Sequence, residues 1–466
     1  MRKPNEMTIA EAARALRARE CSVRELWDAC FEAAHARNPE LHAFLEIFDA
    51  DDVAITATQK RIDANDSSLL CGIPLAIKDN ILIEGKTASA ASKMLENYRA
   101  TYDATVIKKL KNAGALFLGR TNMDEFALGG STENSAFGVT KNPHDTSRVP
   151  GGTSGGSAAA VAAHLVIAAL GTDTGGSIRN PSSYCGVIGL KPTYGAVSRS
   201  GIIAAVSSFD QVGPITKTAE DARILFNVIR GIDEKDSTTI PDDVYPHNKK
   251  KIKTIGVPMH LFADILGKDM LERFQSTLKK CGVKIKEIEI PSAKPALAAY
   301  YIINFAEVST NLARFDGMRY GLAKRGETLL DDYLLSRTNG FGEESRRRIL
   351  RGTFVLSSGY IDAYYHKAIA ARTQLTREFM DAFKEVDIIA TPTMPTPAFK
   401  IGEKSDPLTL YLEDIFTVLA NLTGMPAISV PMGFVERNSK KLPVGIQFIA
   451  PHQAENILFP LGTAVY

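Results

Sequence analysis

The chain has 466 residues, 45% of them hydrophobic, so it is long enough to bury a large core. Its 55 basic and 53 acidic residues nearly cancel, which leaves no strong field for nucleic acid or an anionic membrane and argues against tight direct binding of RNA. Five scattered cysteines form no CxxC pair, and no signal peptide or membrane-spanning apolar run occurs, so we expect a cytoplasmic protein without a zinc site or a disulfide framework.

The N-terminal region predicts helices. Thr8 with Glu11, and Ser22 with Glu25, fit the reciprocal capping pattern in front of apolar residues at helical spacing. The first sixty residues are therefore expected to form a helical pair. We expect residues 1–62 to be a helical segment packed on the core of one large domain, residues 63–466.

From Gly72 onward, strand and helix patterns alternate. "GIPLAIKDN" predicts a strand, "ATVIKKLKNAG" a helix stopped by glycine, and "ALFLGRTN" a second strand. After a polar, basic connection (242–253), a similar passage consists of "TIGVP", a helix over 270–281 and "VKIKEIEIP". Helices are expected over 298–386, then strands in "DIIATPTMP", "AISVPMGF" and "VGIQFIA". Such alternation predicts parallel βαβ units. The chain ends at Tyr466 inside an expected last helix, which suggests truncation.

The glycine- and serine-rich stretch 151–179 is the strongest chemical signal. "GGTSGGS" and "GTDTGGSIR" place hydroxyl groups among glycines, which allow positive φ and close approach of another backbone or a ligand. A flexible linker is the alternative, but linkers are polar throughout. Here the glycines bracket the apolar segment 158–170, which predicts a helix followed by a buried strand. The pattern favours a nucleophile site.

A hydroxyl nucleophile needs a base, and the sequence favours lysine over histidine. The eight histidines are dispersed and lie in no catalytic or metal-binding motif. Residues 152–156 satisfy G-x-S-x-G, but the preceding "NPHDTSRVP" is not the buried strand that a hydrolase elbow requires, and no phosphate-binding loop motif occurs. Lys78 ends an apolar strand, where α/β sites usually form, and a buried lysine can be neutral near pH 7. A surface lysine is the alternative.

The run from Gly151 to Pro192, which ends in "GGSIRNPSSYCGVIGLKP", together with "GIPLAIKDN", resembles the amidase signature family over nearly the whole chain, with a signature region of about 72–215. The resemblance implies a single large α/β/α domain with a mixed, mostly parallel central sheet flanked by helices. It also implies a serine nucleophile, a bridging hydroxyl that follows a cis peptide bond, and a lysine. At the matching positions stand Ser177, Thr153 and Lys78.

The resemblance also places backbone N–H donors for the oxyanion in the loop before the nucleophile, at Thr174, Gly175, Gly176 and Ser177 itself. Thr153 departs from the family's usual serine, and its methyl group restricts χ1. Ser154 is therefore the fallback for the relay. A catalytically weak scaffold that only positions its partners is the non-enzymatic alternative.

Further motifs resemble one branch of the family, among them "GRTNMDEFALGGSTENSAFGVTKNP", "RFDGMRYG" and "GTFVLSSGYIDAYY". That branch hydrolyses glutamine and passes ammonia to a partner, for transamidation of Glu-tRNA(Gln), Asp-tRNA(Asn) or both. The resemblance implies a tRNA-binding B subunit together with a small C subunit, with charged tRNA, ATP and Mg²⁺ on the partner and no cofactor or metal on this chain. It implies that Tyr300, Arg348 and Asp414 hold glutamine, because arginine can pair with the α-carboxylate and aspartate with the α-ammonium.

Alternatives remain for each of these residues and for the activity. Arg348 lies in "SRRRIL", where an exposed helix face is an equal interpretation, and Tyr300 could be an ordinary core residue. The alternative activity is that of a free-standing amidase acting on small aliphatic or aryl amides.

Overall fold

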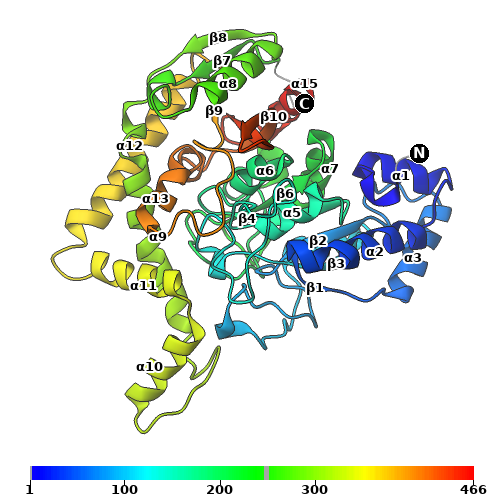
Figure 1. Ribbon diagram of the computed structural model, residues 1–466, viewed down its shortest axis with the longest axis horizontal. Helices are drawn as coiled ribbons and strands as arrows, with labels where there is room; N and C mark the ends of the chain where they lie inside the picture. Colours follow the sequence, from blue (N-terminus) through cyan, green and yellow to red (C-terminus); the bar gives the residue numbers. More distant parts are fainter. Residues whose placement is uncertain (1–2, 246–250, 466) are drawn as a thin grey trace.

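The computed structural model describes residues 3–245 and 251–465, and an 11-stranded sheet runs through it in the order β1-β3-β2-β4-β6-β5-β10-β11-β9-β7-β8 (Figure 1). Its strands are β1 (Phe44–Ile47), β2 (Pro74–Lys78), β3 (Leu116–Thr121), β4 (Ala168–Asp173), β5 (Ile188–Lys191), β6 (Gln211–Thr216), β7 (Thr254–Val257), β8 (Lys284–Glu287), β9 (Ile388–Pro392), β10 (Ala427–Arg437) and β11 (Lys440–Ile449). The strands predicted from Gly72 onward are confirmed.

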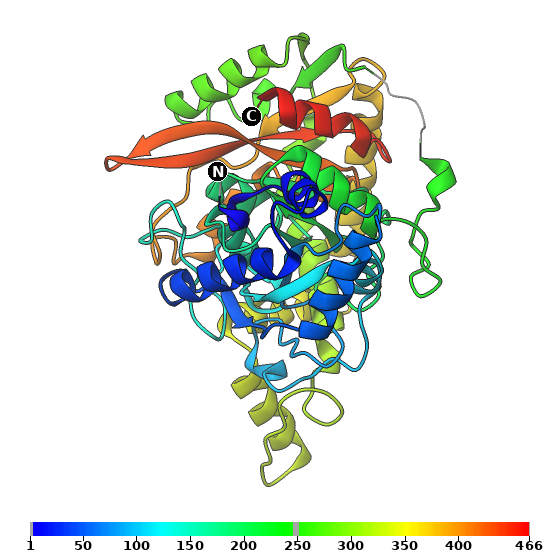
Figure 2. The same ribbon diagram turned by 90° about the vertical axis from the view of Figure 1, so that its right-hand side faces the viewer.

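The sheet is mixed, as predicted, but the expectation that it is mostly parallel is wrong. Parallel pairing is confined to β3-β2-β4 and to β9-β7-β8, and the other neighbouring pairs run antiparallel. For β10 and β11, the antiparallel pairing follows from the short turn between them. Asn438 and Ser439 both have positive φ, as the tight turn of a β-hairpin requires. This hairpin extends to one side of the molecule in Figure 2.

Helices cover the sheet as expected for an α/β fold (Figure 1). They are α1 (Ile9–Arg17), α2 (Val23–Leu41), α3 (Asp52–Asp63), α4 (Thr105–Asn112), α5 (Gly155–Ala162), α6 (Arg179–Cys185), α7 (Ala219–Ile229), α8 (Lys268–Lys280), α9 (Ala296–Asn311), α10 (Leu329–Gly340), α11 (Glu343–Val355), α12 (Lys367–Ala382), α13 (Pro407–Tyr411), α14 (Val418–Leu422) and α15 (Leu458–Val465). α9 packs against α11 and α12 on one side of the sheet, while α10 protrudes at the lower end of both views (Figures 1 and 2).

Both predicted capping boxes are present, at the starts of α1 and α2. The N-terminal segment is nevertheless more than a helical pair, because after α2 the chain enters β1, which pairs antiparallel with β3. Four residues are too short for a strand pattern to stand out in the sequence. The division at residue 62 stays a prediction. Of the predicted polar connection over 242–253, residues 246–250 lie outside the described part.

Two parallel strands position the site. β2 and β4 are neighbours in register, with Ile77 beside Leu170, so Lys78 and the residues that end β4 meet at the carboxyl edge of the sheet. The loop into α5 crosses this edge, and Gly156 allows the approach, because a Cβ there would lie 2.4 Å from the carbonyl oxygens of Ala43 and Asn122. Within the described residues, no helix is both long and apolar enough to span a bilayer.

Candidate active site

Lys78 is buried at the centre of a ring of hydroxyl groups. Its Nζ lies 2.7 Å from Thr153 Oγ1, 2.8 Å from Ser154 Oγ and 2.9 Å from Thr172 Oγ1. Burial lowers the pKa of Lys78 to about 7, against the opposing effect of Asp124 and other nearby carboxylates. The surface-lysine alternative is therefore wrong, and the amine can be neutral near pH 7.

The structure brings the predicted relay residues to one place. The Gly152–Thr153 peptide bond is cis, as the resemblance implied. The Ser154 N–H donates to the carbonyl oxygen of Ser177 over 3.0 Å, so the two glycine-rich loops lie side by side. Ser177 is only 7% exposed. The hydrogen bonds among the described residues include the contact from Lys78 to Thr153 but none made by the Ser177 hydroxyl.

A buried ion pair shapes the loop before Ser177. Asp173 accepts hydrogen bonds from Arg179, from the Gly176 N–H at 2.9 Å and from the Ile178 N–H at 3.2 Å. The expectation that Gly176 donates to an oxyanion is therefore wrong in this structure, because Asp173 already takes that N–H. Thr174, Gly175 and Ser177 remain as candidate donors.

The three predicted glutamine-binding residues lie in one connected cluster. Asn304 joins two of them, since it donates to the Tyr300 hydroxyl over 3.3 Å and accepts from Arg348 Nη1 over 3.1 Å. The Tyr301 hydroxyl donates to Asp414 over 2.7 Å, and the Arg348 guanidinium lies over the Tyr301 ring at 5.5 Å. Tyr300 also reaches the loop before Ser177, because a Cβ on Gly175 would lie 2.2 Å from its hydroxyl.

The charges in this cluster suit an amino acid. Arg348 is 3% exposed, so the exposed-helix interpretation is wrong. Burial alone would lower the pKa of Arg348, but the nearby Glu344 carboxylate raises that pKa well above its usual range. Burial raises the pKa of Asp414 to about 7, against the effect of its hydrogen bond from Tyr301. In the described structure Arg348 Nη2 and Asp414 Oδ1 make no hydrogen bond, so a cation donor and a carboxylate oxygen are available.

Comparison with known proteins agrees with this geometry, since the family model described as Amidase matches residues 25–459. The chain belongs to the amidase family. It is 52% identical over 87% of its length, and 85% of the other chain, to the A subunit of glutamyl-tRNA(Gln) amidotransferase from Thermodesulfovibrio yellowstonii. It is 46% identical to the protein of that name from Desulfatibacillum aliphaticivorans, over 98% of this chain and 96% of the other. A crystal structure of the protein of that name from Thermotoga maritima superposes with a TM-score of 0.80 at 41% identity, and the match covers 99% and 94% of the two chains.

Several residues of this amidase-family site were missed in the sequence. Thr172 contacts Lys78 because β2 and β4 run parallel in register, and a threonine at the end of a buried strand next to that of Lys78 was an available signal. Asn304 lies four residues after Tyr300 on α9, which puts both on one helix face. Tyr301 had no such signal, since its role depends on the approach of Asp414 from a 3₁₀ helix, Leu412–Ile415, that is distant in the sequence.

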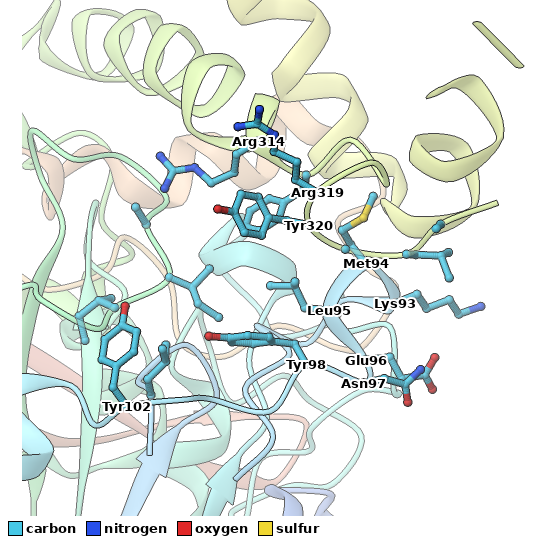
Figure 3. A pocket seen from close by; sticks show the side chains of 18 residues that line it. Lys93, Met94, Leu95, Glu96, Asn97, Tyr98, Tyr102, Arg314, Arg319 and Tyr320 are labelled. Atoms are coloured by element: carbon cyan, nitrogen blue, oxygen red, sulfur yellow. The ribbon is translucent and has the colours of Figure 1, made fainter. Parts of the chain in front are cut away.

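One cavity borders the cluster around Arg348. Its volume is about 470 Å³, and it reaches the cluster through Glu344, the partner of Arg348. A larger cavity of about 750 Å³ lies between Tyr98 and Tyr320, with Arg314 and Arg319 at its edge (Figure 3). None of the predicted site residues lines the larger one. Among the described residues, no group of three or more His, Cys, Asp or Glu side chains could hold a metal ion.

The buried Asp173–Arg179 pair allows a first test of what holds the loop before Ser177 in place. Both side chains are fully buried, and Arg179 overcomes the effect of burial and holds the pKa of Asp173 well below its usual range. We expect Asp173→Asn to lower the free energy of unfolding by about 3–5 kcal/mol, because it leaves a buried guanidinium uncompensated. Urea unfolding measures this loss. The control, Asp381→Asn, breaks the exposed pair with Lys384 and should cost below about 1 kcal/mol. An equal loss in both variants would contradict the assignment.

Proposed function

We propose that this chain is the glutamine-hydrolysing subunit of a tRNA-dependent amidotransferase. The observation that carries the proposal is the buried Lys78 amine, which lies 2.7 Å from the Thr153 hydroxyl. Thr153 and Ser177 lie on the two neighbouring glycine-rich loops, and Gly175 of the second loop lies against Tyr300. The relatives, which are named as the A subunit of glutamyl-tRNA(Gln) amidotransferase, support the choice of substrate. They favour this activity over that of a free-standing amidase.

In the proposed reaction neutral Lys78 takes the proton of Thr153 while Thr153 takes that of Ser177, and the Ser177 oxygen attacks the side-chain carbonyl of glutamine. Backbone N–H groups of Thr174, Gly175 and Ser177 stabilise the oxyanion. When the tetrahedral intermediate collapses, the C–N bond breaks, and Lys78 returns the proton through Thr153 so that ammonia leaves. Water then attacks the acyl-enzyme by the same route and releases glutamate.

The hydrogen bonds favour Thr153 over Ser154 as the bridge. The Ser154 hydroxyl donates to the Thr172 carbonyl oxygen over 3.1 Å and accepts from Lys78, so its proton is already engaged. Within the described residues Thr153 Oγ1 has Lys78 as its hydrogen-bonding partner. Its proton can therefore pass to the amine while its lone pair receives the proton of Ser177. Threonine contacts the lysine in spite of its restricted χ1.

Glutamine recognition follows from the cluster around Arg348. We infer that Arg348 Nη2 binds the α-carboxylate, that Asp414 Oδ1 binds the α-ammonium, and that the Tyr300 hydroxyl contacts the ligand above Gly175. Two tyrosine rings, of Tyr301 and Tyr411, lie on the guanidinium at 5.5 and 5.3 Å and hold its plane.

A partner is part of the proposal. The relatives are named as one subunit of a larger enzyme. Four leucines close together on α10 are 41% to 65% exposed, whereas apolar residues on an ordinary surface are scattered singly; they are Leu329, Leu330, Leu334 and Leu335. We assign this face to contact with a tRNA-binding B subunit or a small C subunit, in the cytoplasm. Charged tRNA, ATP and Mg²⁺ are assigned to the partner, which agrees with the near-neutral charge of this chain.

The proposal is tested by measuring glutamine-dependent transamidation of Glu-tRNA(Gln) and Asp-tRNA(Asn) after the chain has been co-purified with a candidate tRNA-binding partner. We expect ammonia transfer in the complex, feeble glutamine hydrolysis by the isolated chain, and a glutamyl adduct on Ser177 by mass spectrometry that is absent from Ser177→Ala. Robust turnover of acetamide-like substrates by the chain alone, with none of glutamine, would favour the free-standing amidase. A complex that assembles but forms no adduct would favour the scaffold.

The pH dependence of glutamine binding gives a second test. Because the pKa of Asp414 is raised to about 7, its carboxylate is charged above that pH and protonated below it. We therefore expect the KM for glutamine to rise as the pH falls from 8 to 6. Asp414→Asn should raise the KM about ten- to a hundredfold, since it removes a hydrogen bond to a charged group, and should flatten the pH dependence of KM. Initial rates of glutamate release measure both effects, and an unchanged KM would contradict the role of Asp414.

A further inference from the structure

Asn80 has an unpaired, buried side-chain atom next to the lysine. Its Nδ2 donates to Thr172 Oγ1 over 3.1 Å, while its Oδ1 is buried and has no hydrogen-bond partner among the described residues. A buried amide oxygen without a partner costs free energy and calls for an explanation. A half-turn of the amide exchanges Nδ2 and Oδ1 with little change in shape. The bond to Thr172 is the one side-chain hydrogen bond of Asn80 in the described structure, so the turn pairs Oδ1 with Thr172 and leaves Nδ2 in the unpartnered position.

The orientation of this amide decides where the proton of Thr172 points. A hydroxyl has one proton to donate and two lone pairs. If Nδ2 of Asn80 faces Thr172, the Thr172 proton is left to the nearest remaining acceptor, which is the lone pair of a neutral Lys78 at 2.9 Å. If Oδ1 faces Thr172, the proton goes to the amide and Thr172 can only accept from Lys78.

The proton count on the lysine makes the second orientation the productive one. A neutral amine has two N–H donors and one lone pair. Three hydroxyls surround it at 2.7 to 2.9 Å, and the Thr172 carbonyl oxygen, which already accepts from Ser154, lies farther away at 3.3 Å. Ser154 accepts one N–H, because its own proton is engaged by the Thr172 carbonyl. When Thr172 accepts the other N–H, the lone pair faces Thr153, where the relay needs it.

We propose that Asn80 is a positioning residue, whose side-chain oxygen accepts the Thr172 proton and so directs the lone pair of Lys78 to Thr153. This inference rests on the proposed relay and is independent of which amide is the substrate. Asn80 acts through Thr172, which contacts the lysine, and Asn80 itself touches no reacting atom. Together they exclude the hydrogen bond that would otherwise occupy the base.

The test uses a reagent rather than glutamine, so that it does not depend on the substrate. Phenylmethylsulfonyl fluoride forms a bond from its sulfur to Ser177 Oγ, fluoride leaves, and the serine proton passes through Thr153 to Lys78. The rate of this modification in the full chain, measured by intact mass between pH 5 and 10, reports the base directly. If the parent chain is not modified at Ser177, the proposed relay fails, and this result is distinct from a failure of the inference.

Two substitutions separate positioning from packing. Asn80→Ala removes the acceptor, so we expect the plateau rate at high pH to fall roughly ten- to a hundredfold, the range expected for a lost buried hydrogen bond. Asn80→Asp has the same shape and only acceptor atoms, so it should keep the plateau. Its charge, added to those of Asp124, Asp173 and Asp210, should move the rise of the rate to higher pH.

A plateau in Asn80→Ala equal to that of the parent chain, or a plateau in Asn80→Asp as low as that of Asn80→Ala, would overturn the inference. If Asn80→Ala does not fold, Thr172→Val takes its place, and we expect Thr172→Ser to restore the plateau. Failure of Thr172→Ser to restore the plateau would also overturn the inference. The matched control is Thr121→Val, which removes a buried hydroxyl at the end of β3 that is bonded to Ser157 and not to the lysine. It should leave the plateau unchanged.

Discussion

Lys78→Met should reduce glutamine hydrolysis about a hundred- to ten-thousandfold, the usual contribution of a positioned general base. Methionine fills the same buried space without a basic atom, so neither the attack by Ser177 nor the departure of ammonia has a proton carrier. The parent enzyme should lose kcat as the pH falls through about 7, where the Lys78 amine becomes protonated. The variant should show no such fall, because its residual rate does not depend on that amine. Ammonia release between pH 5.5 and 9 measures both effects.

The chain offers a matched control in Lys191, a second buried lysine whose pKa burial lowers to about 7. Its Nζ donates to the Pro192 carbonyl oxygen over 2.7 Å, and it makes no hydrogen bond to the hydroxyl ring. Lys191→Met should therefore keep both kcat and the acid limb near pH 7. If Lys191→Met removes the acid limb and Lys78→Met does not, the base has been assigned to the wrong residue.

The stability of Lys78→Met distinguishes a lost base from a lost fold. Burial lowers the pKa of Lys78 from its unfolded value near 10.5 to about 7, so between these values the unfolded chain binds an extra proton and the parent protein gains stability as the pH rises. Methionine removes this dependence. The melting temperature of the variant at pH 7 should thus not fall relative to the parent protein, and its rise between pH 7 and 10 should be smaller. Differential scanning calorimetry at several pH values tests this.

The sequence predicted the elements around the site well because their signals are local. The strand that ends in Lys78 and the helix and strand between the glycine loops each have their own pattern of apolar residues. The order of the strands and their directions are not local, so the parallel alternation near Gly72 does not continue through the rest of the sheet, which the resemblance implied to be mostly parallel. Antiparallel pairing such as that of β10 with β11 depends on turns whose φ angles the pattern of apolar residues does not show.

The residues of the candidate site also divide into those with a local signal in the sequence and those without one. Glycines and hydroxyls close in sequence marked the stretch that holds Thr153 and Ser177, whereas the choice of these two residues, like that of Arg348 and Tyr300, depended on resemblance. The reason is physical: whether an arginine on a helix faces solvent or a ligand depends on what packs against it, here Tyr301 from α9 and Tyr411 from α13. The N–H of Gly176 was misassigned for a related reason, because a glycine in a loop shows freedom of approach but not which acceptor takes its N–H.

Thr153→Val and Ser154→Ala should differ sharply, because of these two hydroxyls only that of Thr153 has a proton to pass to Lys78. Valine keeps the shape of threonine and removes the oxygen 2.7 Å from the amine, so kcat for glutamine should fall about a hundredfold or more while KM stays within a fewfold. Ser154→Ala removes a hydroxyl whose proton goes to the Thr172 carbonyl, and a loss of roughly tenfold from a looser lysine is expected. Thr153→Ser should retain activity, since it keeps the oxygen and frees χ1. The three kcat values, measured with the chain in its complex, decide the route. A larger loss for Ser154→Ala than for Thr153→Val would make Ser154 the bridge. The Ser154 hydroxyl would then have to break its hydrogen bond to the Thr172 carbonyl oxygen before it could relay the proton of Ser177.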